Sequence, residues 1–262
     1  MAFITVKFNS DCLRRPVSFE LTLPNDPRKD IPWEENTPHK ERPTKTLFLL
    51  HGYYGCAGSW VPEYLAEHYN IAVVSPNGEN GFWLDGLSTG HKYGTFLGEE
   101  LPEYLQKTFG LANSAEDTYI MGLSMGGFGS LRNGLAYPER FGKIGAMSSA
   151  LIVHEVAGMQ PGGGNMVANY DYYRECFGDP AEVLASENNP ETLAVKLLEE
   201  GKKLPDIYMC CGTEDFLLEN NRELHRFFEE HGVPHEYHES AGTHDMRFWG
   251  EYTEKILKWM LE

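Results

Sequence analysis

The stretch DTYIMGLSMGGFGSLRNGLAYP, residues 117–138, places a serine between glycines where one sequence pattern gives way to another. The part before Ser124 is apolar and predicts a buried strand, and the part after it predicts a helix that ends before a proline. Gly122 and Gly126 would let strand and helix approach closely, with the serine oxygen above the strand ends and beside a helix N-terminus. This context is typical of a nucleophile elbow. A glycine-rich turn without chemistry is the alternative, because the five-residue motif arises by chance in about one such chain in ten.

The rest of the chain repeats the alternation of strand and helix. An opening hairpin and further strands are expected at residues 2–8, 17–23, 44–50, 71–76, 141–151, 206–212 and 235–240, and helices at 97–109, 219–232 and 247–261. Apolar runs separated by helical patterns are typical of parallel strands with helices on both faces. The sequence therefore predicts an α/β fold with a mostly parallel, doubly wound sheet.

Two segments depart from this alternation. Residues 25–44 are rich in proline and charge and are interpreted as a loop. Residues 154–204 are too long for a simple connection and are interpreted as an insertion of short helices and loops over one edge of the sheet. With 262 residues, the chain 1–262 is expected to form one domain that carries this insertion as a cap or pocket-shaping segment.

Composition narrows the classes of function. The chain is 41% hydrophobic and 13% aromatic, which allows a large core, and its formal net charge of −17 disfavours nucleic acid as a partner. The sequence contains no apolar run long enough to cross a membrane and no recognisable signal peptide, which favours the cytoplasm. The chain has five cysteines, an odd number, and their spacing fits no zinc-binding pattern. Both observations indicate a reducing compartment. The cysteines are Cys12, Cys56, Cys176, Cys210 and Cys211.

An acid to support Ser124 is expected after a later strand, because α/β hydrolases place serine, acid and histidine in that order. Asp215 lies in a loop just past the apolar run 206–212, at a carboxyl end where chemistry collects in open sheets. Glu214 is the neighbouring candidate, but adjacent side chains point apart. Asp215 is preferred.

The histidine is expected in the loop after the last strand. His244 lies there, whereas His235 and His238 lie within the strand pattern itself, where a structural histidine is the default. Asp245 is interpreted as the cap of the final helix. His244 is therefore the predicted general base.

Backbone donors for an oxyanion are expected from two places. One is the N–H of Met125, directly after the serine, and the other is the N–H of Tyr53 in the glycine-rich loop after residues 44–50. A loop that binds nothing is the alternative reading of that glycine-rich stretch. His51 precedes the serine in the chain and is interpreted as a brace of the loop.

Aromatic residues close to these loops are candidates for a substrate pocket, although core packing is the more frequent role of any one of them. They are Tyr54, Trp60, Trp83, Phe128 and Trp249. Trp83, which follows a strand within NGENGFWLDG, is the preferred substrate-binding residue. Cys56 lies beside the glycine-rich loop and is a weaker candidate for contact with the site.

Four segments together carry a family resemblance: LLHGYYGCAGSW, GLSMGGFGSLRNGLAYPERFGKIGAMSSAL, CGTEDFLLENN and GTHDMRFWGEY. They resemble the esterase D-type esterases, with the strongest similarity to bacterial tributyrin esterases and to the feruloyl and acetyl esterases of carbohydrate esterase family 1. The resemblance runs over nearly the whole chain. It implies an α/β-hydrolase fold, cleavage of small carboxylic esters, a triad of Ser124, Asp215 and His244, and oxyanion donors at Tyr53 and Met125.

The expected function is therefore that of a serine carboxylesterase acting on short-chain acyl, acetyl or hydroxycinnamoyl esters, without metal or organic cofactor. Small esters, including esterified plant oligosaccharides, are the expected partners, and the oligomeric state stays open. An S-formylglutathione hydrolase or an acyltransferase would use the same triad, and a non-catalytic binding protein would keep only the fold. The insertion matches none of the four segments, so the acyl group and the alcohol stay undetermined.

Overall fold

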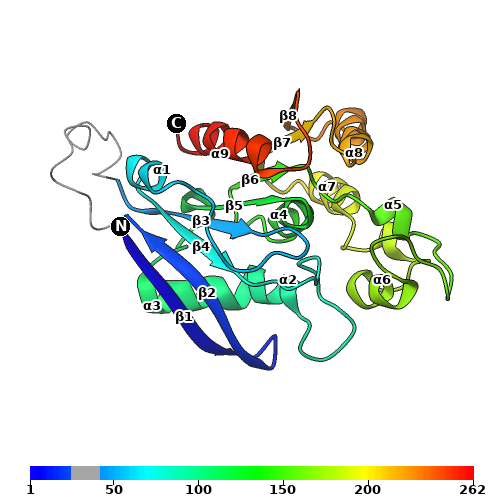
Figure 1. Cartoon of the computed structure of the whole chain (residues 1–262), viewed down its shortest axis with the longest axis horizontal. Coiled ribbons are helices and arrows are strands. Elements are labelled where there is room, and N and C mark those ends of the chain that lie inside the picture. Colours follow the sequence, from blue (N-terminus) through cyan, green and yellow to red (C-terminus); the bar gives the residue numbers. More distant parts are fainter. Residues whose placement is uncertain (25–41) are drawn as a thin grey trace.

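The computed structural model describes residues 1–24 and 42–262, and its eight strands form one mixed sheet with helices on both sides (Figure 1). The strand order is β1-β2-β4-β3-β5-β6-β7-β8. The pairs β1–β2 and β2–β4 are antiparallel, and all other neighbouring pairs are parallel. The predicted opening hairpin and mostly parallel sheet are confirmed. The predicted loop at 25–44 lies almost entirely outside the described residues.

The strands are β1 (Ala2–Ser10), β2 (Arg15–Leu23), β3 (Lys45–Leu50), β4 (Ile71–Pro76), β5 (Thr118–Leu123), β6 (Lys143–Met147), β7 (Asp206–Gly212) and β8 (Glu236–Ser240). The helices are α1 (Glu63–His68), α2 (Tyr93–Thr95), α3 (Leu101–Phe109), α4 (Met125–Ala136), α5 (Val153–Val156), α6 (Tyr170–Phe177), α7 (Pro190–Glu199), α8 (Leu218–His231) and α9 (Met246–Leu261). Short 3₁₀ turns occupy Ala115–Asp117 and Val183–Ala185.

The helix predicted at 97–109 begins earlier than expected. It starts at Tyr93 as α2, passes through a π-helical segment at Phe96–Glu100, and continues as α3. Pro102 follows the widened turn, and it has no N–H for the usual bond four residues back. The interruption therefore lies just before the residue that cannot support a regular helical ladder.

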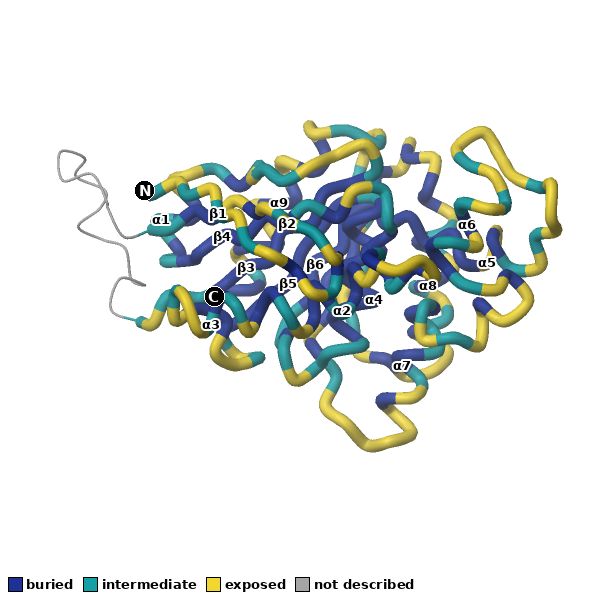
Figure 2. Tube along the Cα trace, turned by 90° about the horizontal axis from the view of Figure 1, so that it is seen from below, coloured by how far each residue is buried: buried dark blue, intermediate teal, exposed yellow. Residues whose placement is uncertain are grey.

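Alternate residues of the central strands pack into two cores, one on each face of the sheet. On β3, Phe48 and Leu50 join one cluster, and Leu47 and Leu49 join the other. Side chains of a strand point alternately to opposite faces, so a strand covered on both sides is apolar throughout. Figure 2 shows the result: the tube is buried through the central strands, whereas the outer strands β1 and β2 carry exposed residues.

The insertion between β6 and β7 contains α5, α6 and α7. Figure 1 shows α5 and α6 at the end of the molecule toward which β3 points. Carboxyl ends of parallel strands are the edge where α/β sheets hold ligands. The insertion thus lies near the edge where Ser124, Asp215 and His244 also follow their strands. Of the helices described, none is long and apolar enough to span a membrane.

Candidate active site

Ser124 connects β5 directly to α4, and its backbone is held at φ 56° and ψ −120°. Such a conformation costs a residue other than glycine about 1–3 kcal/mol, so the surroundings must enforce it. A Cβ on Gly122 would lie 2.3 Å from the carbonyl oxygen of Gly126, and one on Gly126 would lie 2.0 Å from that of Leu50. The two glycines therefore permit the close packing that forces the turn at Ser124.

Two backbone hydrogen bonds fix the serine from the neighbouring strand. The N–H of Ser124 donates to the carbonyl oxygen of Met147 at 2.9 Å, and the N–H of Ala150 donates to the carbonyl oxygen of Ser124 at 2.9 Å. Both partners belong to the chain at the end of β6. Both the N–H and the carbonyl oxygen of the nucleophile candidate are thus fixed by hydrogen bonds.

His244 connects Ser124 to Asp215. Its Nε2 lies 3.0 Å from the Oγ of Ser124, and its Nδ1 lies 2.8 Å from Oδ2 and 3.0 Å from Oδ1 of Asp215. A neutral imidazole that donates from Nδ1 to the carboxylate leaves Nε2 free to accept the serine proton. The structure therefore brings together, in an unbroken hydrogen-bonded chain, the three side chains predicted from three separate loops.

The environment of Asp215 keeps its carboxyl group ionised. The residue is buried, and burial by itself raises the pKa of a carboxyl group. Hydrogen bonds from His244, from the N–H of Leu217 and from Ser148 outweigh burial and hold the pKa of Asp215 below its usual range. A negative charge is thereby fixed beside the Nδ1 atom of His244.

Glu214, the rival acid, has a different task. Its Oε2 accepts the N–H of Gly242 at 2.6 Å, and its own N–H donates to the carbonyl oxygen of Gly242 at 3.0 Å. A Cβ on Gly212 would lie 2.2 Å from that same carbonyl oxygen. Glu214 thus ties the loop that carries Asp215 to the loop that carries His244.

The rival histidines lie in other surroundings. His235 is paired with His225 of α8, with 2.8 Å between Nε2 and Nδ1, and His238 is 3.2 Å from the carboxylate of Glu236. Asp245 accepts the N–H groups at the start of α9, so its predicted role as a helix cap is confirmed.

The loop after β3 lies against the nucleophile. A Cβ on Gly52 would be 3.3 Å from the Cβ of Ser124, so a side chain at this position would be crowded against the serine. Within ranges 1–24 and 42–262, neither the N–H of Tyr53 nor that of Met125 donates a hydrogen bond. Both N–H groups are therefore free to bind a ligand, and Met125 directly follows the nucleophile candidate in the chain.

His51 braces that loop. Its Nδ1 donates to the carbonyl oxygen of Gly52 at 2.8 Å, and its Nε2 accepts the N–H of Gly78 at 3.0 Å. Burial lowers the pKa of His51, so the ring stays neutral, as this pairing of one donor and one acceptor needs. Both ring nitrogens are occupied by backbone groups, which excludes His51 as the partner of Ser124.

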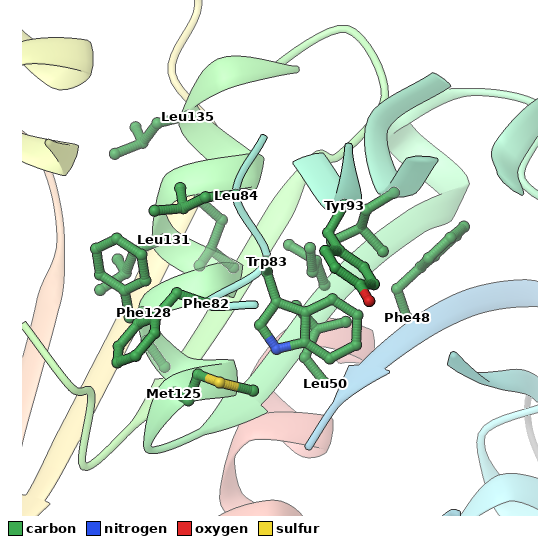
Figure 3. Close-up of a cluster of buried hydrophobic side chains, with 14 of the residues drawn as sticks. Phe48, Leu50, Phe82, Trp83, Leu84, Tyr93, Met125, Phe128, Leu131 and Leu135 are labelled. Atoms are coloured by element: carbon green, nitrogen blue, oxygen red, sulfur yellow. The ribbon is translucent and has the colours of Figure 1, made fainter. Parts of the chain in front are cut away.

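Trp83, the predicted substrate-binding residue, faces the protein interior instead. Its side chain is 0% exposed, its Nε1 donates to the carbonyl oxygen of His51 at 3.3 Å, and its ring packs against Gly129 of α4. Figure 3 shows the indole within a cluster that includes Phe128 and Tyr93. The prediction is corrected: Trp83 supports the loop from beneath and offers a substrate no surface.

The other aromatic candidates differ in exposure. Phe128 is fully buried, Trp60 donates its Nε1 to Thr253, and Trp249 is 8% exposed, whereas Tyr54 is 86% exposed on the loop after β3. Cys56 is also exposed, in the same loop as Tyr54.

Sequence reasoning missed Phe216. It is 75% exposed, and its ring centroid lies 4.6 Å from that of His244. Its position next to Asp215 in a loop at a strand end was the available signal.

The insertion is anchored to the loops around the site. The hydroxyl of Tyr172 donates to the carbonyl oxygen of Asn80, and the Oδ1 of Asn80 accepts the N–H of Tyr54 at 3.0 Å. Glu175 binds the N–H and hydroxyl of Ser88 at 2.9 and 2.8 Å. Helix α6 therefore determines where the loop after β4 lies, and through Asn80 it reaches the loop that carries Tyr53.

The described part of the chain contains no group of three or more His, Cys, Asp and Glu side chains placed to hold a metal ion.

Comparisons with known proteins show the family and the fold. Residues 13–260 match a family model described as "Putative esterase". An acetyl esterase of Caldicellulosiruptor saccharolyticus is 39% identical over 265 residues, which cover 99% of this chain and 98% of that protein.

Two solved structures from Staphylococcus aureus share the fold. A substrate-bound fluorophosphonate-binding serine hydrolase F superposes with a TM-score of 0.82 at 24% identity, covering 100% of this chain and 98% of that one. An S-formylglutathione hydrolase superposes with a TM-score of 0.81 at 24% identity, covering 100% and 99%. At this identity they show the α/β-hydrolase fold. The family match and the acetyl esterase relative show that this chain belongs to the esterase family.

Proposed function

We propose that the protein is a serine carboxylesterase that removes acetyl and other short acyl groups from their esters. Ser124 is the nucleophile, His244 the general base and Asp215 the residue that orients and stabilises His244. The observation that carries the proposal is the hydrogen-bonded chain from the Oγ of Ser124 through His244 to Asp215. A serine is a weak nucleophile until a base accepts its proton. In this row of hydrogen bonds His244 is the base, and Asp215 fixes its tautomer.

The first half of the reaction forms an acyl-enzyme. As the Oγ of Ser124 attacks the ester carbonyl carbon, its proton passes to the Nε2 of His244, which lies 3.0 Å away. The imidazolium that forms is stabilised by the Asp215 carboxylate at Nδ1. The tetrahedral intermediate then collapses, the bond to the alcohol oxygen breaks, and His244 returns the proton to the departing alcohol.

The second half consumes water. His244 accepts a proton from a water molecule, whose oxygen attacks the acyl carbon, and the acid leaves as Ser124 recovers its proton. In both halves the carbonyl oxygen becomes an oxyanion, which the N–H groups of Tyr53 and Met125 would receive. Each such donor contributes about 3 kcal/mol in the transition state, because it is oriented before charge develops.

Acetyl is the preferred acyl group for two reasons. The 39% identical relative is an acetyl esterase. In addition, Trp83 and Phe128 are fully buried and close the interior beside the loop after β3 and α4, so a long acyl chain would have to displace core side chains.

The Ser124→Ala variant tests the mechanism with p-nitrophenyl acetate. We expect kcat to fall by at least about 10⁴-fold, because the nucleophile is lost while the fold is kept. Ser130→Ala is the matched control. Ser130 lies on α4 and its hydroxyl donates to the carbonyl oxygen of Gly126 at 2.8 Å, within its own helix, so full activity is expected. A fluorophosphonate probe should label the native protein and Ser130→Ala but not Ser124→Ala. Retained activity in Ser124→Ala would remove this residue from the mechanism.

A substrate panel tests the specificity. We expect kcat/KM to be highest for p-nitrophenyl acetate, lower for the butyrate and lowest for the octanoate, with acetylated xylo-oligosaccharide also cleaved. Preference for methyl ferulate would favour a feruloyl esterase, and preference for S-formylglutathione would favour the thioesterase alternative. Either result would contradict the acetyl specificity while leaving the triad in place.

A further inference from the structure

The loop after β3 contains a residue in a strained conformation. Tyr54 has a φ of 63°, and its side chain is 86% exposed. Positive φ is costly for a residue with a Cβ, and it persists only where the surrounding structure enforces it. Because most of the Tyr54 side chain lies in solvent, contacts of the backbone are the expected source of the restraint.

Tyr53 and Tyr54 are the two central residues of a tight turn. The N–H of Gly55 donates to the carbonyl oxygen of Gly52 at 3.0 Å, which closes the turn. A turn with positive φ at its second central residue usually has glycine there. With tyrosine in this position, a rotation of the Tyr53–Tyr54 peptide plane would bring φ back to negative values and relieve the strain.

The peptide group before Tyr53 is held through its carbonyl end. The carbonyl oxygen of Gly52 accepts hydrogen bonds from the Nδ1 of His51 at 2.8 Å and from the N–H of Gly55 at 3.0 Å. A trans peptide is planar, and its N–H points opposite to its carbonyl oxygen. These two bonds therefore also fix the direction of the N–H of Tyr53.

The peptide group after Tyr53 is held by Asn80, which belongs to the loop after β4. The Oδ1 of Asn80 accepts the N–H of Tyr54 at 3.0 Å. Rotation of the Tyr53–Tyr54 peptide would turn this N–H away and break the bond. Asn80 therefore opposes the rotation that would relieve the strain at Tyr54.

The loop that carries Asn80 is itself anchored at three points. The hydroxyl of Tyr172, on helix α6 of the insertion, donates to the carbonyl oxygen of Asn80. On either side of Asn80, the N–H of Gly78 donates to the Nε2 of His51 at 3.0 Å, and the Nε1 of Trp83 donates to the carbonyl oxygen of His51 at 3.3 Å. The amide oxygen of Asn80 is thus presented to the turn from a fixed position.

We propose that Asn80 is a positioning residue of the oxyanion site, which keeps the N–H of Tyr53 in place by holding the Tyr53–Tyr54 peptide in its strained orientation. Asn80 acts through the backbone of the turn and touches neither substrate nor reacting atoms. Tyr172 supports it from the insertion. The inference rests on the proposed function, because Tyr53 is an oxyanion donor only in that reaction.

Asn80→Ala and Asn165→Ala form a matched pair for the test. Both remove an amide oxygen that accepts backbone N–H groups in a loop. The Oδ1 of Asn165, however, accepts from Val167 and Ala168, at 2.9 and 3.0 Å, within the insertion itself. Asn165→Ala therefore reports a general loosening of the insertion, and its kinetics should match those of the native protein.

We expect Asn80→Ala to lower kcat for p-nitrophenyl acetate by about ten- to a hundredfold, less than the roughly 10²–10³-fold that complete removal of an oxyanion donor costs. KM should hardly change, since Asn80 does not touch the substrate. The acid limb of the pH profile should stay in place, because Ser124, His244 and Asp215 are untouched. A trifluoromethyl ketone forms a hemiketal with an active-site serine, and its oxygen occupies the oxyanion site. Its Ki should therefore rise by about the factor by which kcat falls.

A double-mutant cycle with Tyr54→Gly tests the role of the strained turn. Glycine adopts positive φ about as readily as negative φ, so the turn no longer depends on Asn80 to the same extent. The fold-loss in kcat caused by Asn80→Ala should therefore be several times smaller in the Tyr54→Gly background. Equal losses in the two backgrounds would show that Asn80 does not act through the conformation of Tyr54, and would overturn the inference.

A further readout does not depend on turnover. In NMR, the temperature coefficient of the Tyr54 amide proton should become more negative in Asn80→Ala, as for an amide that has lost its acceptor. It should stay near the native value in Asn80→Asp, which keeps an oxygen at the same place, and in Asn165→Ala. An unchanged Tyr54 amide in Asn80→Ala would contradict the inference.

Failure of the inference can be told apart from failure of the proposed function. Native kcat and inhibitor Ki in Asn80→Ala, with Ser124→Ala inactive, would overturn the positioning role and leave the esterase mechanism in place. So would equal losses in Asn80→Ala and Asn165→Ala. Activity retained in Ser124→Ala would instead remove the proposed mechanism and, with it, the role of Tyr53 that Asn80 is inferred to support.

Discussion

The phenyl ring of Phe216 lies 4.6 Å from the imidazole of His244, although 75% of Phe216 is exposed to solvent. The ring of Trp249, which is buried, contacts the same imidazole with a centroid distance of 4.8 Å. The base therefore contacts one exposed aromatic ring and one buried one. An exposed phenyl group contributes little burial energy, so its effect should appear in the chemistry rather than in stability.

Phe216→Ala should lower kcat/KM about two- to fivefold, because an exposed ring beside a cation contributes about 0.5–1 kcal/mol to the imidazolium. The midpoint of urea unfolding should hardly change. Phe3→Ala is the matched control, since Phe3 is 65% exposed on the outer strand β1. Equal kinetics for the two variants would show that Phe216 has no part in the reaction.

Asp215→Asn should lower kcat about 10⁴-fold, because an amide can hold His244 in the wrong tautomer. Glu214→Gln separates the two neighbouring acids. A glutamine still accepts the N–H of Gly242 and so keeps the two loops tied together, and near-native kcat is expected. Steady-state kinetics with p-nitrophenyl acetate measures both variants. A large loss in Glu214→Gln with little loss in Asp215→Asn would reverse the choice of acid.

Gly126→Ala should destabilise the fold by about 3 kcal/mol or more, because its Cβ would meet rigid backbone atoms of Leu50 and His51. Gly250→Ala is the matched control within α9. A Cβ on Gly250 meets nothing within 4 Å, and alanine in a helix interior should stabilise by about 0.5–1 kcal/mol. Urea unfolding measures both. A tolerated Gly126→Ala would mean that the elbow is less tightly packed than these distances indicate.

The lowered pKa of Asp215 predicts a pH-dependent contribution to stability. The folded pKa lies below the unfolded value of about 3.9, so the contribution is complete above that value and is lost as pH falls through the folded pKa. Asp215→Asn cannot titrate at this position. The difference in unfolding free energy between the native protein and this variant should therefore shrink as pH falls from about 6 toward 3. A constant difference would show that the folded and unfolded pKa values are equal.

The two neighbouring acids show how much of the site can be predicted from local sequence. The sequence favours Asp215 and His244 because each follows a strand, and the structure places both in the chain of hydrogen bonds with Ser124. Glu214 follows the same strand, and the one sequence argument that favours Asp215 over it is that adjacent side chains point apart. The structural role of Glu214 depends on the hydrogen bond that it accepts from the N–H of Gly242, which belongs to another loop.

Trp83 and Phe216 show the limit of that reasoning. Both are aromatic residues in loops near strand ends, yet one is 0% and the other 75% exposed. Whether a loop side chain turns inward depends on what packs over it, and Trp83 is covered by α4 and by the loop after β3. The aromatic residue type alone therefore could not tell the supporting ring from the exposed one.

The sequence by itself determined the alternation of strand and helix, the turn at Ser124 and the order of the three side chains, because these depend on patterns a few residues long. Only the tertiary structure decided the distances among Ser124, His244 and Asp215. The loops that carry these residues are separated by more than twenty residues of chain at each step, and the order of strands in the sheet is what brings them together. Hydrogen bonds between such loops join residues that are far apart in the sequence, so no local pattern records them.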